Sequence, residues 1–120
     1  MTSQEEPEQL TVVDDEPQPG VLVARMTGWL ALATAPGAEA RLQALLDTRA
    51  PRSIVLDLSR TEFLGSAGVA VLLRLRRRAL ALGCGPPCLV GLNGGARRTL
   101  HGLGLLEMFS TADDVSAALP

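Results

Sequence analysis

One run of residues constrains this chain more than any other: Ser53 to Leu73 reads S-I-V-L-D-L-S-R-T-E-F-L-G-S-A-G-V-A-V-L-L. The apolar residues from Ser53 to Leu58 predict a short strand that is covered on both faces, as in the centre of an α/β sheet. A turn bounded by Gly65 and Gly68 follows, and the next apolar residues recur at helical spacing. We expect Ser66, inside this turn, to be the N-cap of the helix, where a phosphate would change both charge and shape.

The predicted helix after the turn has two different sides. Its core-facing stripe consists of Gly68, Leu72, Leu75, Ala79 and Leu82. Its charged side consists of Arg74, Arg77 and Arg78. A flanking edge of Val69, Leu73 and Leu80 either widens the contact with the core, which we favour, or is left for a partner.

Strand and helix patterns alternate along the rest of the chain. Further strands are expected over 21–27, ending at a turn at Gly28, and over 87–93. Helices are expected from Pro36 with Thr34 as cap, after Asn93 with Arg97 and Arg98, and from Thr111. Residues 103–109 are expected to return to the sheet or to pack beside it. This order predicts an α/β sheet covered by helices and preceded by an antiparallel N-terminal strand pair.

Length and charge indicate one domain with an acidic leader. A chain of 120 residues suits a single core, which must be aliphatic because only 2% of the residues are aromatic. Residues 1–20 carry six acids and no base, whereas the remainder carries eleven arginines and seven acids. We therefore expect a disordered acidic arm over 1–9 and a single domain over 10–120, whose first residues form an edge strand.

Several function classes are disfavoured by what the sequence contains. All eleven basic residues are arginine, which removes phosphate-loop and Schiff-base lysines. Cys84 and Cys88 have only His101 as a further metal ligand, so we expect reduced thiols and no metal or other cofactor. No apolar run approaches membrane-spanning length, and the first residues are polar and acidic, so we expect a cytoplasmic protein that does not insert into a membrane.

Two activities that the motifs suggest superficially are also disfavoured. The segment Leu64-Gly-Ser-Ala-Gly68 is like the G-x-S-x-G elbow of esterases, but it has Leu64 in place of glycine and His101 as the sole base. We therefore predict no catalytic residue and no enzyme activity. The arginine cluster at 74 and 76–78 lacks interleaved aromatics, and the chain has a net charge of −2, so we expect no nucleic acid partner.

Two motifs give the chain a resemblance to a known family. Asp57-Leu58-Ser59 followed by Phe63-Leu-Gly-Ser-Ala-Gly-Val69 resembles the D-L-S-x-x-x-F-[LIM]-D-S-[ST]-G-[LV] pattern of STAS domains, which are found in sulfate transporters and anti-sigma factor antagonists. Upstream, Gly28 to Pro36 is similar to that family's G-E-L-D-x-A-[TS]-A-P. The resemblance spans roughly residues 10–119. It implies the STAS (SpoIIAA-like) fold, a mixed, mostly parallel sheet of four to five strands covered by about four helices.

The resemblance also implies a function. Anti-sigma factor antagonists of this family bind a serine kinase that otherwise sequesters a sigma factor, and phosphorylation of the motif serine ends the binding. Carried over, Ser66 is the phosphoacceptor, and Asp57 and Phe63 support the turn. The implied partner-binding residues are Gly65, Ser66, Ala67, Gly68, Val69, Leu73, Arg74 and Arg77.

This chain departs from the family pattern at the acids. Gly65 replaces the Asp before the serine, Ala67 replaces the Ser or Thr after it, and Trp29 and Ala31 replace the acids of G-E-L-D. We therefore keep two alternatives to a kinase-binding antagonist: a STAS subunit of a phospholipid-transport ABC system, and a small-molecule sensor that binds an anion at the turn. In each case we expect a monomer or a weak dimer.

Overall fold

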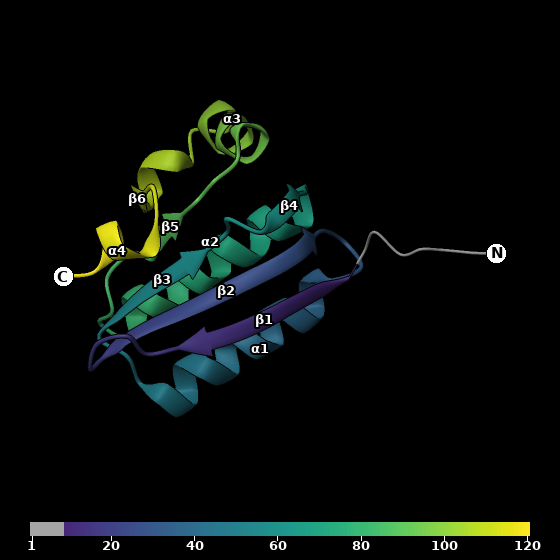
Figure 1. Cartoon of the computed structure of the whole chain (residues 1–120). Helices are drawn as coiled ribbons and strands as arrows, with labels where there is room; N and C mark the ends of the chain where they lie inside the picture. The colour runs from purple at the N-terminus through teal and green to yellow at the C-terminus, as the bar shows by residue number, and fades with distance from the viewer. Residues whose placement is uncertain (1–8) are drawn as a thin grey trace.

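A mixed sheet forms the centre of the computed structural model, which describes residues 9–120 (Figure 1). Its strands follow the order β1-β2-β3-β5-β6, and β4 pairs with β2 beyond the end of β3. The strands are β1 (Leu10–Asp15), β2 (Val21–Leu30), β3 (Ser53–Asp57), β4 (Thr61–Leu64), β5 (Cys88–Val90) and β6 (Ser110–Ala112). Only the β1–β2 pair is antiparallel among the described strands, which confirms the expected α/β topology. The described residues form six strands, whereas four to five were expected; the difference is the short strand β4, which was not predicted.

Two long helices cover one face of the sheet, and a short helix covers part of the other. The helices are α1 (Ala35–Arg49), α2 (Ser66–Ala81), α3 (Gly94–Gly102) and α4 (Val115–Ala118), with a 3-10 turn at Leu106–Met108. Figure 1 shows α1 and α2 behind the sheet, with α4 beside β5 and β6. As expected, α3 begins after Asn93, and the Asn93 side chain caps it by accepting a hydrogen bond from the Ala96 N–H at 2.8 Å.

The core is aliphatic on both faces of β3. On the larger side, Leu56 and its neighbours pack against α1, α2 and α3, and Phe109 is the one aromatic residue buried among the described residues. On the other side, α4 packs over a cluster of four valines: Val21, Val23, Val55 and Val90. Adjacent residues Val55 and Leu56 are both buried, as predicted for a strand at the centre of the sheet.

The strand β2 does not end at Gly28, as predicted, but continues to Leu30. Gly28 has a φ of +122°, and a β-bulge lies between it and Trp29. A Cβ atom at Gly28 would stand 2.1 Å from the carbonyl oxygen of Gln9, so this position requires glycine. The bulge lets Trp29 and Leu30 pair with Phe63 and Leu64 of β4, which extends the sheet towards the start of α2.

Two helix predictions also need correction. Leu82, expected in the core stripe, lies after the end of α2 and is 49% exposed. Thr111 belongs to β6, and the last helix begins at Val115, where Asp114 accepts a hydrogen bond from the Ala117 N–H at 2.9 Å. The capping geometry of Asp114 therefore decides where this helix starts.

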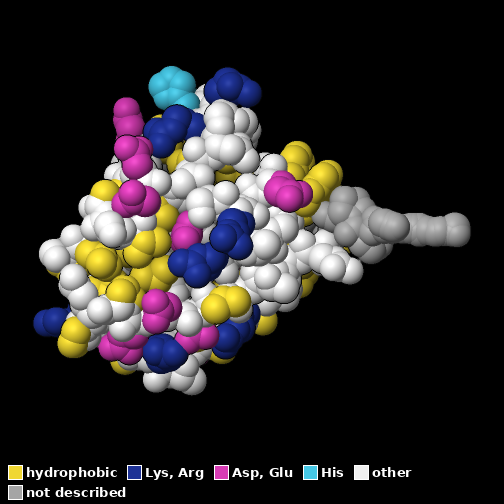
Figure 2. All heavy atoms as spheres, viewed as in Figure 1, with side chains coloured by type: hydrophobic (Ala, Val, Ile, Leu, Met, Phe, Trp, Pro, Cys, Tyr) yellow, Lys and Arg dark blue, Asp and Glu magenta, His cyan; other side chains and the backbone are white. Residues whose placement is uncertain are grey.

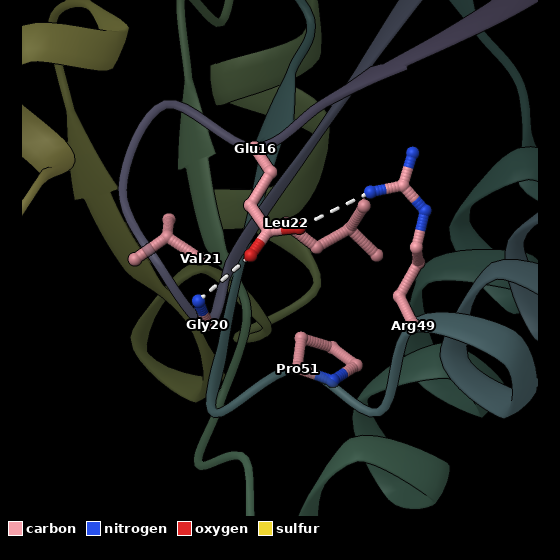
Figure 3. A pocket seen from close by; sticks show the side chains of 6 residues that line it. All are labelled: Glu16, Gly20, Val21, Leu22, Arg49 and Pro51. Atoms are coloured by element: carbon pink, nitrogen blue, oxygen red, sulfur yellow. Dashed lines mark hydrogen bonds and ion pairs between the residues drawn. The ribbon is translucent and has the colours of Figure 1, made fainter.

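The acidic leader continues into the sheet. The arm expected over 1–9 lies outside the described residues except for Gln9. Asp14, in β1, forms ion pairs with Arg41 and Arg49 of α1, and Glu16 accepts hydrogen bonds from Arg49 and from the Gly20 N–H (Figure 3). The cavity beside Glu16 has a volume of about 10 Å³, which suits at most one water molecule.

Candidate functional site

Ser66 is the first residue of α2 rather than its N-cap. Gly65 occupies the cap with an extended ψ of 178°, so helical geometry starts one residue earlier than predicted, and no side chain closes this cap. The Gly65 N–H donates to the carbonyl oxygen of Leu30 at 2.9 Å, and the Val69 N–H donates to the carbonyl oxygen of Gly65 at 3.0 Å. The turn is thus fixed by its backbone, while Ser66 is exposed at the positive end of the helix dipole.

Gly68 brings α2 against the ends of β2 and β4. A Cβ atom at Gly68 would stand 2.6 Å from the Leu30 carbonyl oxygen and 2.9 Å from Cδ1 of Leu64. Val69, next to it, is also buried. Neither residue is accessible at the surface, so their role in the structure is to fix the position of the turn.

The other expected partner-binding residues differ in exposure. Ser66, Arg74 and Arg77 are exposed, whereas Gly65, Ala67 and Leu73 are half-buried. The structure thus leaves an accessible strip that starts at Ser66 and follows α2.

Asp57 braces the turn between β3 and β4. Its carboxylate accepts hydrogen bonds from the Ser59 N–H at 3.0 Å, from the Ser59 hydroxyl at 2.7 Å and from Nε of Arg25 at 3.0 Å. Burial by itself would raise the Asp57 pKa, but the hydrogen bonds from Ser59 and Arg25 outweigh it, so the pKa is lowered. Asp57 therefore holds the turn that leads into β4, and β4 in turn leads into the Ser66 turn.

Phe63 borders the Ser66 turn directly. Its side chain packs against Trp29, with ring centroids 4.8 Å apart and an angle of 35° between the planes. A Cβ atom at Gly65 would stand only 3.0 Å from Cε2 of Phe63. Sequence reasoning identified Phe63 but did not assign a role to Trp29, although its place in the position of a family acid was the available signal.

Most of the arginine cluster on α2 is engaged within the molecule. Arg74 donates from Nε and Nη2 to the two carboxylate oxygens of Glu39 in α1, at 2.8 Å each, and this pairing lowers the Glu39 pKa. Arg78 pairs with Asp47, and Arg76 donates to the carbonyl oxygen of Met108 at 2.7 Å. Arg77 is exposed and forms no ion pair within residues 9–120. Arg77 is therefore the cluster's best candidate for contact with a partner.

Neither cysteine forms a disulfide in the structure. Cys84 is buried and donates from Sγ to the carbonyl oxygen of Pro51 at 3.2 Å, and burial raises the pKa of both Cys84 and Cys88. In the described part of the chain, no group of three His, Cys, Asp or Glu side chains is placed to hold a metal ion. Over the same residues, no helix is long and apolar enough to cross a membrane.

A comparison with protein-family models tests the family resemblance that the two sequence motifs suggest. The STAS domain model matches residues 13–118. The chain belongs to the STAS domain family. A comparison with curated protein sequences finds no match.

Solved structures share the fold of this STAS domain. An anti-sigma factor antagonist from Mycobacterium paratuberculosis is 29% identical, with a TM-score of 0.83, and the match covers 96% of this chain and 95% of that one. The unphosphorylated form of the anti-sigma factor antagonist SpoIIAA is 21% identical, with a TM-score of 0.73 over 90% of this chain and 93% of that one. A sulfate transporter family protein from Wolinella succinogenes is 21% identical, with a TM-score of 0.69 over 83% and 82% of the two chains.

Proposed function

We propose that this STAS domain, over residues 10–120, is an anti-sigma factor antagonist that binds an anti-sigma serine kinase and thereby acts indirectly on a sigma factor. The observation that carries the proposal is the exposed Ser66 at the first position of α2, in the place of the family's motif serine. The 29% identity with the mycobacterial antagonist over nearly the full length of both chains supports it. The role is one of binding in the cytoplasm, with no catalysis, cofactor or metal supplied by this chain.

Phosphorylation of Ser66 is the proposed off switch. A phosphate adds a charge of about −1.5 to −2, and the start of α2 accommodates it because free N–H groups and the helix dipole favour an anion there. The same charge inside a packed interface is costly, because it must lose water and finds no partner. Modification therefore weakens the complex without unfolding the domain. SpoIIAA, which has the same fold, has been solved in a phosphorylated form.

The missing acids favour a second candidate. Residues 29, 31 and 65 carry no charge here, whereas the family pattern has acids at these places. A STAS subunit docked on the ATPase of a phospholipid-transport ABC system needs no phosphorylated serine, so it tolerates these changes. The two candidates differ in the partner that is retained and in the response to charge at Ser66.

The test measures binding by calorimetry to each anti-sigma kinase encoded in the chain's own genome. We expect one kinase to bind wild type and Ser66→Ala with similar affinity and Ser66→Asp at least about tenfold more weakly, a loss of about 1.4 kcal/mol. Absence of any kinase complex with wild type would overturn the proposal. Binding to an ABC ATPase that is unaffected by Ser66→Asp would establish the second candidate instead.

A further inference from the structure

Three apolar side chains are exposed or half-buried at the ends of β2 and β4, beside the Ser66 turn: Trp29 and Phe63 on the strands, and Leu32 in the turn just after β2. Leu32 is 82% exposed, Phe63 is 44% exposed, and Trp29 is half-buried against Phe63. We call Trp29, Leu32 and Phe63 the aromatic patch. It contains two of the three aromatic residues of the chain, and the third, Phe109, is buried. Figure 2 shows hydrophobic side chains gathered over β4 at this end of the molecule.

The patch and Ser66 are held in one surface by the ends of β2 and β4. Trp29 and Phe63 are register partners on these strands, and the Gly65 N–H is bonded to the Leu30 carbonyl oxygen at 2.9 Å. The Phe63 ring passes so close to Gly65 that a Cβ atom there would stand 3.0 Å from it. A protein that contacts Ser66 therefore also meets the edge of the Phe63 ring.

The N-terminal residues are a poor chemical match for this patch. The described structure begins at Gln9, whose carbonyl oxygen accepts a hydrogen bond from the Trp29 N–H at 3.0 Å. The preceding sequence, M-T-S-Q-E-E-P-E, contains three glutamates and few apolar residues. A carboxylate that packs against an aromatic ring loses hydrating water without gaining a hydrogen bond, which costs free energy. A partner with an apolar surface is the better occupant.

The size of the patch indicates its role. Stable interfaces bury about 1,200–2,000 Å² in total, more than three side chains can supply alone. A second copy of the chain joined only through the patch would therefore bind weakly. Aromatic side chains that are already packed in place are, however, efficient anchors inside a wider interface, because little conformational freedom is lost on binding.

We propose that Trp29, Leu32 and Phe63 are the apolar anchor of the surface that carries Ser66, and that the kinase places an apolar cleft against them. This inference rests on the proposed function. Within the patch, Trp29 stands where the family pattern has the first acid of G-E-L-D, so at this position an apolar contact replaces a charged one. Affinity at this patch should accordingly depend little on salt concentration, because apolar burial is not screened.

The experiment compares two exposed leucines at opposite ends of the domain. Leu32→Ser alters the patch, and Leu82→Ser is the matched control, since Leu82 is 49% exposed just beyond the far end of α2. Affinity for the cognate kinase is measured by calorimetry. We expect Leu32→Ser to weaken binding tenfold or more and Leu82→Ser to change it less than twofold, with both variants folded by circular dichroism.

Trp29, the only tryptophan of the chain, gives an independent readout. Its fluorescence emission should shift to shorter wavelength when the kinase binds, and deletion of residues 2–8 should leave the emission of the free protein unchanged. A shift on that deletion would mean that the N-terminal residues already cover the patch, and would overturn the inference.

The outcomes separate this inference from the function on which it rests. If Ser66→Asp weakens the complex but Leu32→Ser and Phe63→Ala bind like wild type, the patch is not the anchor and the proposed function stands. If no kinase binds wild type, both fall.

Discussion

Gly68 packs directly on the backbone of Leu30, so closely that a Cβ atom at position 68 would stand 2.6 Å from the Leu30 carbonyl oxygen. Backbone cannot move aside as the end of a flexible side chain can. We therefore expect Gly68→Ala to lower the free energy of unfolding by about 1–3 kcal/mol, despite the higher helix propensity of alanine. Denaturant titration followed by circular dichroism measures the change.

Gly37 is the matched control, because it also lies inside a helix. A Cβ atom at Gly37 meets no heavy atom within 4 Å. Gly37→Ala should raise the free energy of unfolding by up to about 1 kcal/mol. Equal effects of the two substitutions would show that Gly68 is not closely packed against β2.

Asp57 makes stability depend on acid pH. Its pKa in the folded protein lies below the ordinary value of 3.8, so its ionised form stabilises the fold. This contribution is fully present above about pH 4 and is lost as the pH falls through the folded pKa. Asp57→Asn should cost about 1–2 kcal/mol at pH 7, since a hydrogen-bonded charge is removed.

Unfolding titrations at pH 7 and at lower pH measure both effects. The difference between wild type and Asp57→Asn should shrink below pH 4. Asp47→Asn, at an exposed pair with Arg78, should change stability by less than about 0.5 kcal/mol at pH 7. A pH-independent difference for Asp57→Asn would contradict the ionised state assigned to Asp57.

Arg74 and Arg77 should affect different properties. Arg74 bridges α2 to Glu39 of α1, so Arg74→Ala should lower the free energy of unfolding only slightly, because solvent screens this exposed ion pair. Arg77 makes no such bridge among the described residues, so Arg77→Ala should leave stability within about 0.5 kcal/mol.

Binding kinetics complete this comparison. If Arg77 meets the partner, Arg77→Ala should slow association, and the difference from wild type should diminish at high salt. Surface plasmon resonance at two salt concentrations measures it. An association rate equal to that of wild type at low salt would remove Arg77 from the interface.

Local patterns predicted the elements whose signals lie within a few consecutive residues. The strand from Ser53 has a continuous apolar run, and Asn93 before two glycines is a typical helix start. The strand β4 was missed because its four residues, T-E-F-L, resemble a connecting loop. It pairs with β2 across a bulge at Gly28, where the backbone of Gln9, a residue far away in the sequence, leaves no room for a side chain.

The sequence predicted which residues form the candidate site better than it predicted their positions in the helix and their exposure. The sequence located Ser66, but only backbone angles distinguish an N-cap from the first helical residue, and these place Gly65 at the cap. Val69 was expected near a partner and is buried, because α2 approaches β2 and β4 at Gly68. Trp29 lacked a role because its contact with Phe63 forms only when β4 pairs with β2.

The most direct test of the partner switch is phosphosite mapping on the protein isolated from its native cells together with its bound partners. The proposed function predicts that a serine kinase co-purifies with the unmodified chain and that the unbound fraction carries one phosphate, on Ser66. A kinase complex in which Ser66 is never modified in any fraction would contradict the switch, and so would an ABC ATPase as the bound partner.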